Sequence, residues 1–236
     1  MPAHNESSSI RSFIPEISAS LSVFECSFVL VDDMSTDDTV MVFDSTLSQV
    51  ERSGTVISNN QNLGHGPSTV KGLQHALLLN PDYVISVDGD GQFIGTDILG
   101  MLENFQSSGA DLAIGVRKNR TDPGFRKVVS SITRMLLWVF SGLKVKDANC
   151  PLRIYSPHAL RTIISHLPQN PLVPNLLVLK IISKLQLKFV EIEVVSIPRR
   201  GSEIIGTMWK SKLTNVPSKR FLSFCLRAFV EFFRFR

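Results

Sequence analysis

Apolar runs that end in polar residues alternate with amphipathic stretches through the first half of the chain. The runs predict buried strands at Cys26–Val31, Thr55–Ser58, Tyr83–Val87 and Asp111–Val116. The stretches predict helices through Val40, Phe43, Leu47 and Val50, and over Val70–Leu79 and Asp97–Phe105, with a loop at Asn59–Ser68. This alternation is typical of an α/β fold with a mostly parallel sheet covered by helices on both faces.

The second half of the chain is richer in helical patterns. Helices are predicted over Phe125–Leu143, Pro157–His166, Pro174–Leu185 and Val216–Arg236, with a strand at Phe189–Val195 and a basic loop at Pro198–Gly206. The last helix carries phenylalanines among arginines, a pattern that suits core packing or an anionic membrane surface. We therefore divide the chain into a main domain, residues 1–215, and a basic amphipathic C-terminal helix, residues 216–236.

Composition narrows the class of protein. The chain has 236 residues, of which 43% are hydrophobic, and this is enough for one sizeable core. Three widely spaced cysteines without a Cys-x-x-Cys pair favour a reducing, cytoplasmic setting over a disulfide framework or a zinc site. The sequence shows no signal peptide, no uninterrupted apolar segment of about 18 residues and no nucleic-acid motif.

The strongest chemical signal is a pair of carboxylates that follows a predicted strand. Asp88 and Asp90 are two residues apart, so in an extended segment both side chains face the same way. Two hard oxygen ligands suit Mg²⁺ or Mn²⁺ with a bound diphosphate. An EF-hand fails at Phe93 and Leu99, and the D-x-D-x-T pattern of dehalogenase-type phosphatases fails at Gln92. A polar turn after the strand is the alternative.

Other polar residues also follow predicted strands and have two interpretations each. Asp32 and Asp33 either cap the next helix or accept hydrogen bonds from a base or ribose. Arg117 belongs to a solvated basic loop or meets phosphate. Asp147 is a turn residue, a general base or an orienting group. His65 and its neighbouring glycines lack a phosphate-loop pattern, which favours a loop-shaping role.

In order, several motifs resemble those of family 2 glycosyltransferases, which have the GT-A fold. Pro2–Glu6 resembles P-x-x-N-E, Val31–Asp37 resembles V-D-D-x-S-x-D, and Asn62–Gly64 and Asp88–Gln92 follow in the usual order. Gly115–Arg117 and Asp147–Arg153 resemble the branch that glycosylates polyprenyl phosphates. The resemblance covers nearly the whole chain.

The resemblance implies a nucleotide-diphospho-sugar transferase with a Rossmann-like sheet, and it assigns roles to particular residues. Pro2, His4, Glu6 and Asp33 would line the nucleoside pocket, whereas Asp88, Asp90 and Gln92 would hold Mg²⁺ or Mn²⁺ on the donor diphosphate. Arg117 and Arg126 would meet donor or acceptor phosphate, and Arg199 or Arg200 would close over it. Asp90, Arg117 and Asp147 are the expected catalytic residues.

The implied activity is inverting transfer of a sugar from a UDP- or GDP-linked donor to polyprenyl phosphate. A cytoplasmic enzyme bound peripherally to the membrane through its C-terminal helix would reconcile a lipid acceptor with the lack of membrane spans. Family members have a hydrophobic strand before P-x-x-N-E, and we expect that first strand to be missing here. The alternatives are a degenerate sugar-nucleotide-binding protein, which the missing strand suggests, and a sugar nucleotidyltransferase, which should carry a Gly-rich phosphate loop near its N-terminus.

Overall fold

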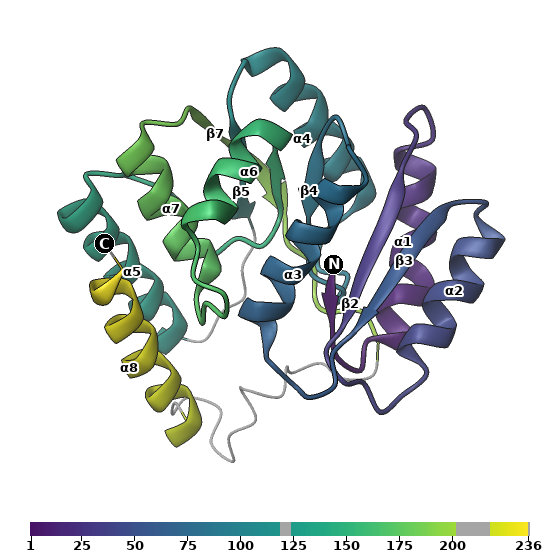
Figure 1. Cartoon of the computed structure of the whole chain (residues 1–236), viewed down its shortest axis with the longest axis horizontal. Coiled ribbons are helices and arrows are strands. Elements are labelled where there is room, and N and C mark those ends of the chain that lie inside the picture. The colour runs from purple at the N-terminus through teal and green to yellow at the C-terminus, as the bar shows by residue number, and fades with distance from the viewer. Residues whose placement is uncertain (119–123, 202–217, 236) are drawn as a thin grey trace.

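The computed structural model describes residues 1–118, 124–201 and 218–235, and it describes the backbone alone for residues 124–127. Two sheets lie side by side, with helices packed on both faces (Figure 1). The predicted α/β fold with helices on both faces is therefore confirmed. No helix in the described ranges is long and apolar enough to cross a membrane.

The first sheet has three parallel strands in the order β1-β2-β3. They are β1 (Pro2–Ala3), β2 (Ser27–Asp32) and β3 (Ser53–Ser58). Two helices, α1 (Ser7–Ser20) and α2 (Thr39–Gln49), pack together beside this sheet (Figure 1). Helix α1 was not predicted, although Ile10, Phe13, Ile14 and Ile17 form its buried stripe at helical spacing.

The expected absence of the first strand is wrong, because a two-residue strand occupies its place. The backbone N–H of Val31 donates to the Met1 carbonyl at 2.9 Å, and that of Asp33 donates to the Ala3 carbonyl at 2.8 Å. The short β1 therefore satisfies polar groups of β2 that would otherwise lack partners. On its other side, the Gly89 N–H donates to the Pro2 carbonyl at 3.1 Å and links β1 to the loop after β4.

The second sheet is mixed, in the order β4-β6-β5-β7. Its strands are β4 (Val84–Ser86), β5 (Leu112–Lys118), β6 (Arg153–Tyr155) and β7 (Phe189–Val195). Strand β6 runs antiparallel to both neighbours, whereas β5 and β7 are parallel. The sequence did not predict β6, since three residues that include an arginine give too short an apolar pattern.

The remaining helices connect and cover the strands. They are α3 (His65–Leu78), α4 (Gly95–Ser108), α5 (Gly124–Ser141), α6 (Pro157–His166), α7 (Pro174–Leu185) and α8 (Lys219–Arg234). The bounds of α6, α7 and β7 match their predictions, but α3 begins at His65 rather than Val70. The basic loop predicted at Pro198–Gly206 is described only as far as Gly201, where it forms neither helix nor strand.

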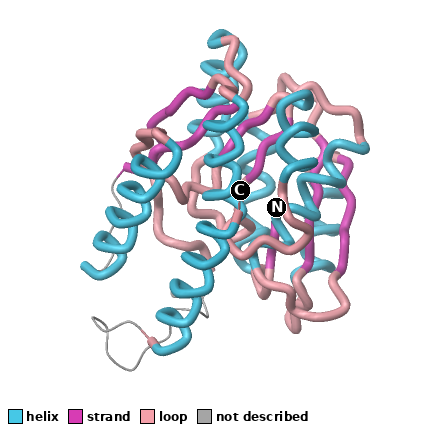
Figure 2. The backbone as a smooth tube through the Cα atoms, turned by 60° about the vertical axis from the view of Figure 1, so that its left-hand side comes forward, coloured by secondary structure: helices cyan, strands magenta, loops and turns pink. Residues whose placement is uncertain are grey.

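Helices α5 and α8 lie on the side of the molecule opposite β1–β3 (Figures 1 and 2). Phe232 of α8 is buried in the core cluster that also contains Leu137 of α5 and Leu179 of α7. The predicted division between residues 215 and 216 falls outside the described residues and stays a prediction.

Candidate functional site

The carboxyl ends of β2, β4 and β5 bring the predicted charged residues together, as expected for a sheet of this kind. Asp33 follows β2, Asp88 lies two residues beyond β4, and Arg117 is the penultimate residue of β5. Arg117 is among the positive groups that lower the pKa of Asp88, after His65 and the N-terminal ammonium. The C-terminal strand ends therefore form the candidate site.

His65 reaches this site, contrary to the prediction of a loop side chain. It is the first residue of α3, and its Nε2 lies 2.8 Å from Asp88 Oδ1. The charge of Asp88 raises the pKa of His65. Burial pushes the pKa of Asp88 upward, but the charge and hydrogen bond of His65, with the N-terminal ammonium and Arg117, bring that pKa below its ordinary value. Asp88 is thus held as a carboxylate.

Asp90 has the opposite electrostatic character. Burial, followed by the charges of Asp88 and Glu6, raises the pKa of Asp90 to about 7. Its Oδ1 accepts a hydrogen bond from the Gln92 backbone N–H at 3.2 Å. Two carboxylates that repel each other in this way are a donor set that a divalent cation would stabilise.

The protein supplies only part of a metal coordination shell at this site. Within the described residues, no group of three or more His, Cys, Asp and Glu side chains is arranged to hold a metal. Asp88 and Asp90 are hard oxygen ligands, which fit Mg²⁺ or Mn²⁺ bound through one or two carboxylates together with substrate phosphates. The residues present fit a metal whose remaining ligands come from a donor.

Arg117 and Asp147 form a forked ion pair beside the carboxylates. Arg117 Nε lies 2.7 Å from Asp147 Oδ2, and Nη2 lies 3.0 Å from Oδ1. The Asn149 backbone N–H also donates to Oδ1, at 3.3 Å. Both side chains are largely buried, with 15% and 6% of their surface exposed. The pair fixes the guanidinium plane of Arg117 at the end of β5.

The carboxylate of Asp33 accepts hydrogen bonds from backbone and side-chain groups of the protein itself. Its two oxygens accept hydrogen bonds from the N–H groups of Leu63 and Gly64, both at 2.8 Å, and from the Asn59 side chain at 2.9 Å. The Asp33 carbonyl lies 2.9 Å from His4 Nδ1. Asp33 therefore joins the Asn62–Gly64 motif to the end of β2, and neither Asp33 nor its neighbour Asp32 provides the cap residue of α2, which is Asp38.

Glu6 and Arg199 meet next to Asp90. The Arg199 guanidinium pairs with the Glu6 carboxylate, which also accepts a hydrogen bond from Ser9 Oγ at 3.1 Å. Burial raises the pKa of Glu6, although Arg199 and Ser9 oppose the change. Both charges act on Asp90, Glu6 raising its pKa and Arg199 lowering it. The structure thus joins an N-terminal motif residue to the loop after β7.

The other predicted residues divide into three cases. Pro2 is buried in β1, where its carbonyl accepts the Gly89 N–H, and Gln92 is half-buried two residues after Asp90. Arg200 turns its guanidinium onto the carbonyls of Gly91 and Phe93. The side chain of Arg126 lies outside the described residues.

A buried arginine that was not given a role supports the Asp147 segment. Arg153 of β6 is fully buried, and its Nε and Nη2 donate to the carbonyls of Cys150 and Ala148 at 3.2 and 2.9 Å. It thereby holds the turn between Asp147 and β6. The sequence could have revealed this role, because Arg153 ends the Asp147–Arg153 motif within an apolar segment. An arginine buried in such a segment needs hydrogen-bond partners.

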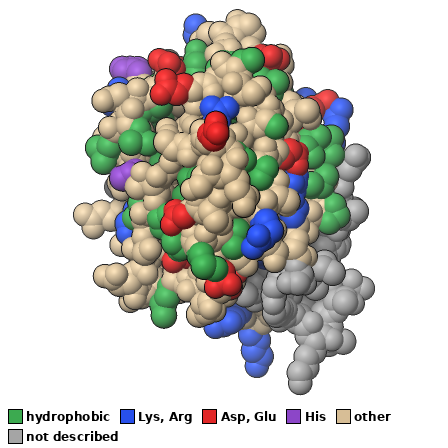
Figure 3. Space-filling view, turned by 90° about the vertical axis from the view of Figure 1, so that its right-hand side faces the viewer, with side chains coloured by type: hydrophobic (Ala, Val, Ile, Leu, Met, Phe, Trp, Pro, Cys, Tyr) green, Lys and Arg blue, Asp and Glu red, His purple; other side chains and the backbone are tan. Residues whose placement is uncertain are grey.

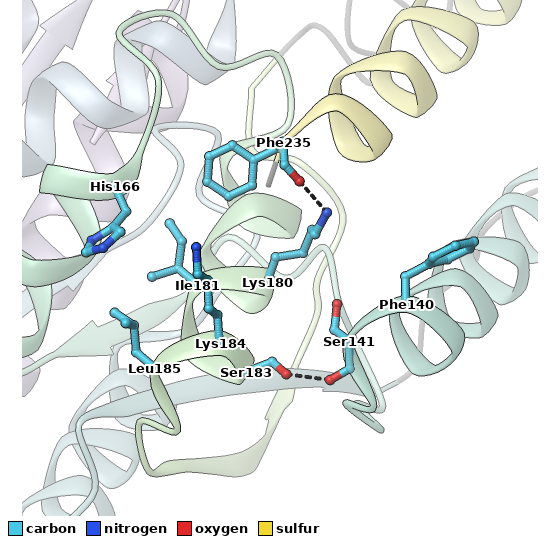
Figure 4. Close-up of a pocket in the computed structure, with 9 residues that line it drawn as sticks. All are labelled: Phe140, Ser141, His166, Lys180, Ile181, Ser183, Lys184, Leu185 and Phe235. Carbon is cyan, nitrogen blue, oxygen red and sulfur yellow. Dashed lines mark hydrogen bonds between the residues drawn. The ribbon is translucent and has the colours of Figure 1, made fainter.

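A cavity of about 330 Å³ lies elsewhere, between α5, α7 and the end of α8 (Figure 4). Lys180 crosses it and donates to the carbonyls of Phe232 and Phe235 at 2.9 and 2.6 Å. Among the described side chains, none of the predicted site residues lines this cavity, which is therefore separate from the strand-end cluster.

Comparison with known proteins matches residues 1–165 to the family described as glycosyl transferase family 2. The chain is 28% identical over 178 residues to an undecaprenyl-phosphate 4-deoxy-4-formamido-L-arabinose transferase of Pectobacterium atrosepticum, covering 75% of this chain and 53% of that protein. It is also 28% identical over 169 residues to a dodecaprenyl-phosphate galacturonate synthase of Rhizobium johnstonii, covering 69% of this chain and 48% of that protein. The chain thus spans about half the length of these two relatives.

Solved structures share the fold. Glucosyl-3-phosphoglycerate synthase from Mycobacterium tuberculosis, in complex with Mn²⁺, UDP-glucose and phosphoglyceric acid, superposes with a TM-score of 0.67 at 19% identity, covering 99% of this chain and 77% of that one. A complex of the same enzyme with Mn²⁺, UDP and phosphoglyceric acid superposes with a TM-score of 0.62 at 20% identity, covering 85% of this chain and 69% of that one. With the family match over most of its length, the chain belongs to glycosyl transferase family 2.

Proposed function

We propose that this protein is an inverting glycosyltransferase that moves a sugar from a nucleoside-diphosphate sugar to polyprenyl phosphate, with Mg²⁺ or Mn²⁺ as cofactor. The observation that carries the proposal is the pair Asp88 and Asp90 at the strand ends, in a chain of family 2. Relatives that transfer sugars to undecaprenyl and dodecaprenyl phosphates support the acceptor class.

On the donor side, the described residues supply binding and orientation. His4 and the Asn62–Gly64 segment, joined by Asp33, would form the nucleoside end of the site. Asp88, Asp90 and Gln92 would hold the cation near the diphosphate, with the Arg199–Glu6 pair alongside. When bound, the cation would neutralise charge on the departing nucleoside diphosphate.

On the acceptor side, the geometry favours a substrate that is already an anion. Asp147 has both oxygens engaged by Arg117, so it cannot accept a proton without weakening a largely buried ion pair. We therefore assign Asp147 to orienting Arg117, in place of the general-base role. A phosphate acceptor needs little help from a base, and a fixed guanidinium is suited to binding it.

A donor screen tests the proposed transfer. UDP- and GDP-linked sugars are each incubated with Mn²⁺ and a short polyprenyl phosphate, and the anomeric configuration of the product is determined by NMR. We expect a glycosyl phospholipid with inverted configuration, and its loss in Asp90→Ala. Binding of a nucleotide sugar without transfer would support a non-catalytic binding protein. Nucleotide-sugar synthesis from a sugar phosphate would support a nucleotidyltransferase.

Helices α5 and α8 would place the acceptor side against a membrane. We define the helix-pair surface as the large apolar side chains that these helices expose: Val128, Ile132, Met135, Trp138, Val139, Phe140, Leu222, Leu226, Val230 and Phe233. The rings of Phe140 and Phe233 are 4.9 Å apart in an edge-on contact, which makes the surface continuous from one helix to the other.

The charges around the helix-pair surface suit anionic lipid headgroups. Helix α8 carries Lys219, Arg220, Arg227 and Arg234. Its single acidic residue, Glu231, turns inward and accepts hydrogen bonds from the backbone N–H groups of Leu172 and Val173. Each basic residue near an anionic surface contributes about 1 kcal/mol. The proposed location is therefore the cytoplasmic face of a membrane.

Flotation with liposomes tests this location. The protein should float with vesicles that contain anionic lipid, and Leu226→Glu, which places a charge on a side chain that is 67% exposed, should reduce flotation. Val23→Glu is the matched control, because Val23 is 82% exposed in the turn between α1 and β2. Equal flotation of the wild type and Leu226→Glu would rule out the helix-pair surface as the membrane contact.

A further inference from the structure

The carboxylate loop, which we define as residues Asp88–Phe93, is held by a segment that lies more than 100 residues later in the chain. The Ile197 backbone N–H donates to the Gln92 carbonyl at 3.0 Å, and the Arg200 N–H donates to the Asp90 carbonyl at 3.1 Å. On its other side, this segment is attached to α1, since Ser9 Oγ donates to the Arg200 carbonyl. The segment follows β7 and lies beyond the residues matched by the family.

The side chain of Arg200 extends along the same loop. Its Nε donates to the Gly91 carbonyl at 2.9 Å and its Nη2 to the Phe93 carbonyl at 3.2 Å, so one guanidinium joins two loop carbonyls. The plane of the group lies over the Phe13 ring, 5.2 Å from its centroid. A lysine ammonium is a point charge without this fork and could not reproduce the arrangement.

Gly91 and Arg200 have complementary shapes. Gly91 has a φ of +67°, and a Cβ added to it would lie 2.7 Å from Cδ of Arg200. Only glycine therefore gives the loop both this backbone conformation and this contact with the arginine stem. The contact with Arg200, which is distant in sequence, thus explains why the second glycine of the Asp-Gly-Asp-Gly motif is a glycine.

Glu16 of α1 completes the network. Its Oε2 lies 2.6 Å from Arg200 Nη2, and its Oε1 accepts a hydrogen bond from the Gly95 backbone N–H at 2.7 Å. Gly95 is the first residue of α4, two residues after the end of the loop. The network therefore fixes both the middle of the carboxylate loop and its exit.

We propose that Arg200 is a positioning residue that sets the backbone of the carboxylate loop and, through it, the relative placement of Asp88 and Asp90. Arg200 acts through the carbonyls of the loop and is not itself a phosphate-binding group, in contrast to the role that the resemblance implied. The inference rests on the proposed function only where it concerns metal affinity. The conformational part stands on the contacts alone.

Hydrogen exchange without metal or nucleotide tests the conformational part. In Arg200→Lys, a peptide spanning residues 88–95 should exchange about tenfold faster than in the wild type, because two loop carbonyls lose the guanidinium and Glu16, which accepts the Gly95 N–H, loses its forked partner. Arg161→Lys, on the exposed face of α6, is the matched control and should leave that peptide unchanged. Unchanged exchange in Arg200→Lys would overturn the proposal.

A second variant covers the case in which Arg200→Lys does not fold. Glu16→Gln keeps an oxygen for the Gly95 N–H but removes the charge that pairs with Arg200. It should accelerate exchange of the same peptide to a smaller extent. Exchange as slow as in the wild type in this variant would count against the network.

Electron paramagnetic resonance with Mn²⁺ and UDP tests the consequence for the site. Affinity for Mn²⁺ should fall about tenfold in Arg200→Lys, the loss typical of removing a residue that orients metal ligands. Wild-type affinity in that variant would overturn the positioning role while leaving the proposed function intact. Failure of the wild type itself to bind Mn²⁺ with UDP would instead remove the proposed function, and the exchange experiment would still decide whether Arg200 holds the loop.

Discussion

The strand-end site and the helix-pair surface use polar and apolar side chains in opposite ways. At the strand ends, charged groups are buried and paired with one another, as in Arg117–Asp147 and Glu6–Arg199. On α5 and α8, apolar side chains are exposed and basic groups stand among them. On the face over α1, α2 and β3, exposed hydrophobic side chains are scattered among polar and charged ones (Figure 3).

This difference separates two kinds of binding. Buried, preorganised charge fits a small anionic ligand that is removed from water. An exposed apolar surface rimmed by cations fits a lipid surface that remains outside the fold. The comparison predicts that substitutions in the first region change stability and chemistry together, whereas those in the second change membrane binding alone.

The largest effect on stability is expected from Arg117→Met. This change removes the guanidinium from the carboxylate of Asp147, which is 6% exposed, and breaking a buried ion pair by removing one partner costs about 3–5 kcal/mol of unfolding free energy. Urea denaturation measures it. Lys118→Met is the matched control, because Lys118 and its partner Glu193 are each more than half exposed and the loss should be far smaller. Equal losses of unfolding free energy in the two variants would contradict the prediction that the buried ion pair contributes more to stability than the exposed one.

A smaller loss is expected at the contact between α3 and the segment before α7. In Gly66→Ala, the new Cβ would lie 2.0 Å from the Pro171 carbonyl oxygen, and such overpacking costs about 1–3 kcal/mol. Gly100→Ala in α4 meets nothing within 4 Å and should raise stability by about 0.5–1 kcal/mol. Thermal unfolding compares the two variants, and a stable Gly66→Ala protein would show that this contact can relax.

The strand-end site should also respond to pH through Asp90. Its pKa of about 7 lies above the ordinary 3.8, so Asp90 must lose a proton before it binds a cation. Affinity for Mn²⁺ in the presence of UDP should therefore weaken roughly tenfold for each unit of pH below about 7. Calorimetry at several pH values checks this, and affinity that stays constant below pH 7 would contradict it.

The same group influences the stability of the metal-free protein. Because the folded pKa of Asp90 is raised, its contribution is fully present below about pH 4 and is lost as the pH rises through about 7. Asp90→Asn removes this contribution, so the difference in unfolding free energy between wild type and variant should change over that interval and be constant above it.

The smallest effect on stability is expected on the helix-pair surface. Leu226→Glu should change the unfolding free energy by no more than about 0.5 kcal/mol, since an exposed side chain away from special features contributes little. The same variant should lose vesicle binding. A large destabilisation would mean that the exposed face of α8 is part of the core, contrary to the comparison.

The sequence predicted the elements with strong periodicity and the motifs that follow strands. Helices α6 and α7 and strand β7 have the predicted bounds, and the family resemblance is confirmed. Strand β6 was missed because three residues carry no reliable pattern, and carbonyls of the preceding turn accept hydrogen bonds from Nε and Nη2 of its buried arginine. The two-residue β1 is defined by its pairing with β2, which no local pattern reveals.

Contacts between distant residues account for most of what the sequence did not predict at the site. Helix α3 begins before the first residue of its apolar pattern, and this places His65 at the helix start, where it contacts Asp88. Arg200 contacts Gly91, which lies more than 100 residues earlier in the chain. Asp33 and Asp147 were found as charged residues near strand ends, but their partners decide their roles. The sequence thus predicts which charged residues lie at strand ends, whereas the role of each charged residue depends on its tertiary contacts.

The account depends most on the two carboxylates at positions 88 and 90. Calorimetric titration of UDP and GDP, with and without Mn²⁺, into the wild type and the double variant Asp88→Asn, Asp90→Asn tests it most directly. We predict that one of the nucleotides binds the wild type tightly only when Mn²⁺ is present, and that the double variant loses this dependence. Nucleotide binding that is equally strong without the metal, or that is unchanged in the double variant, would contradict the account.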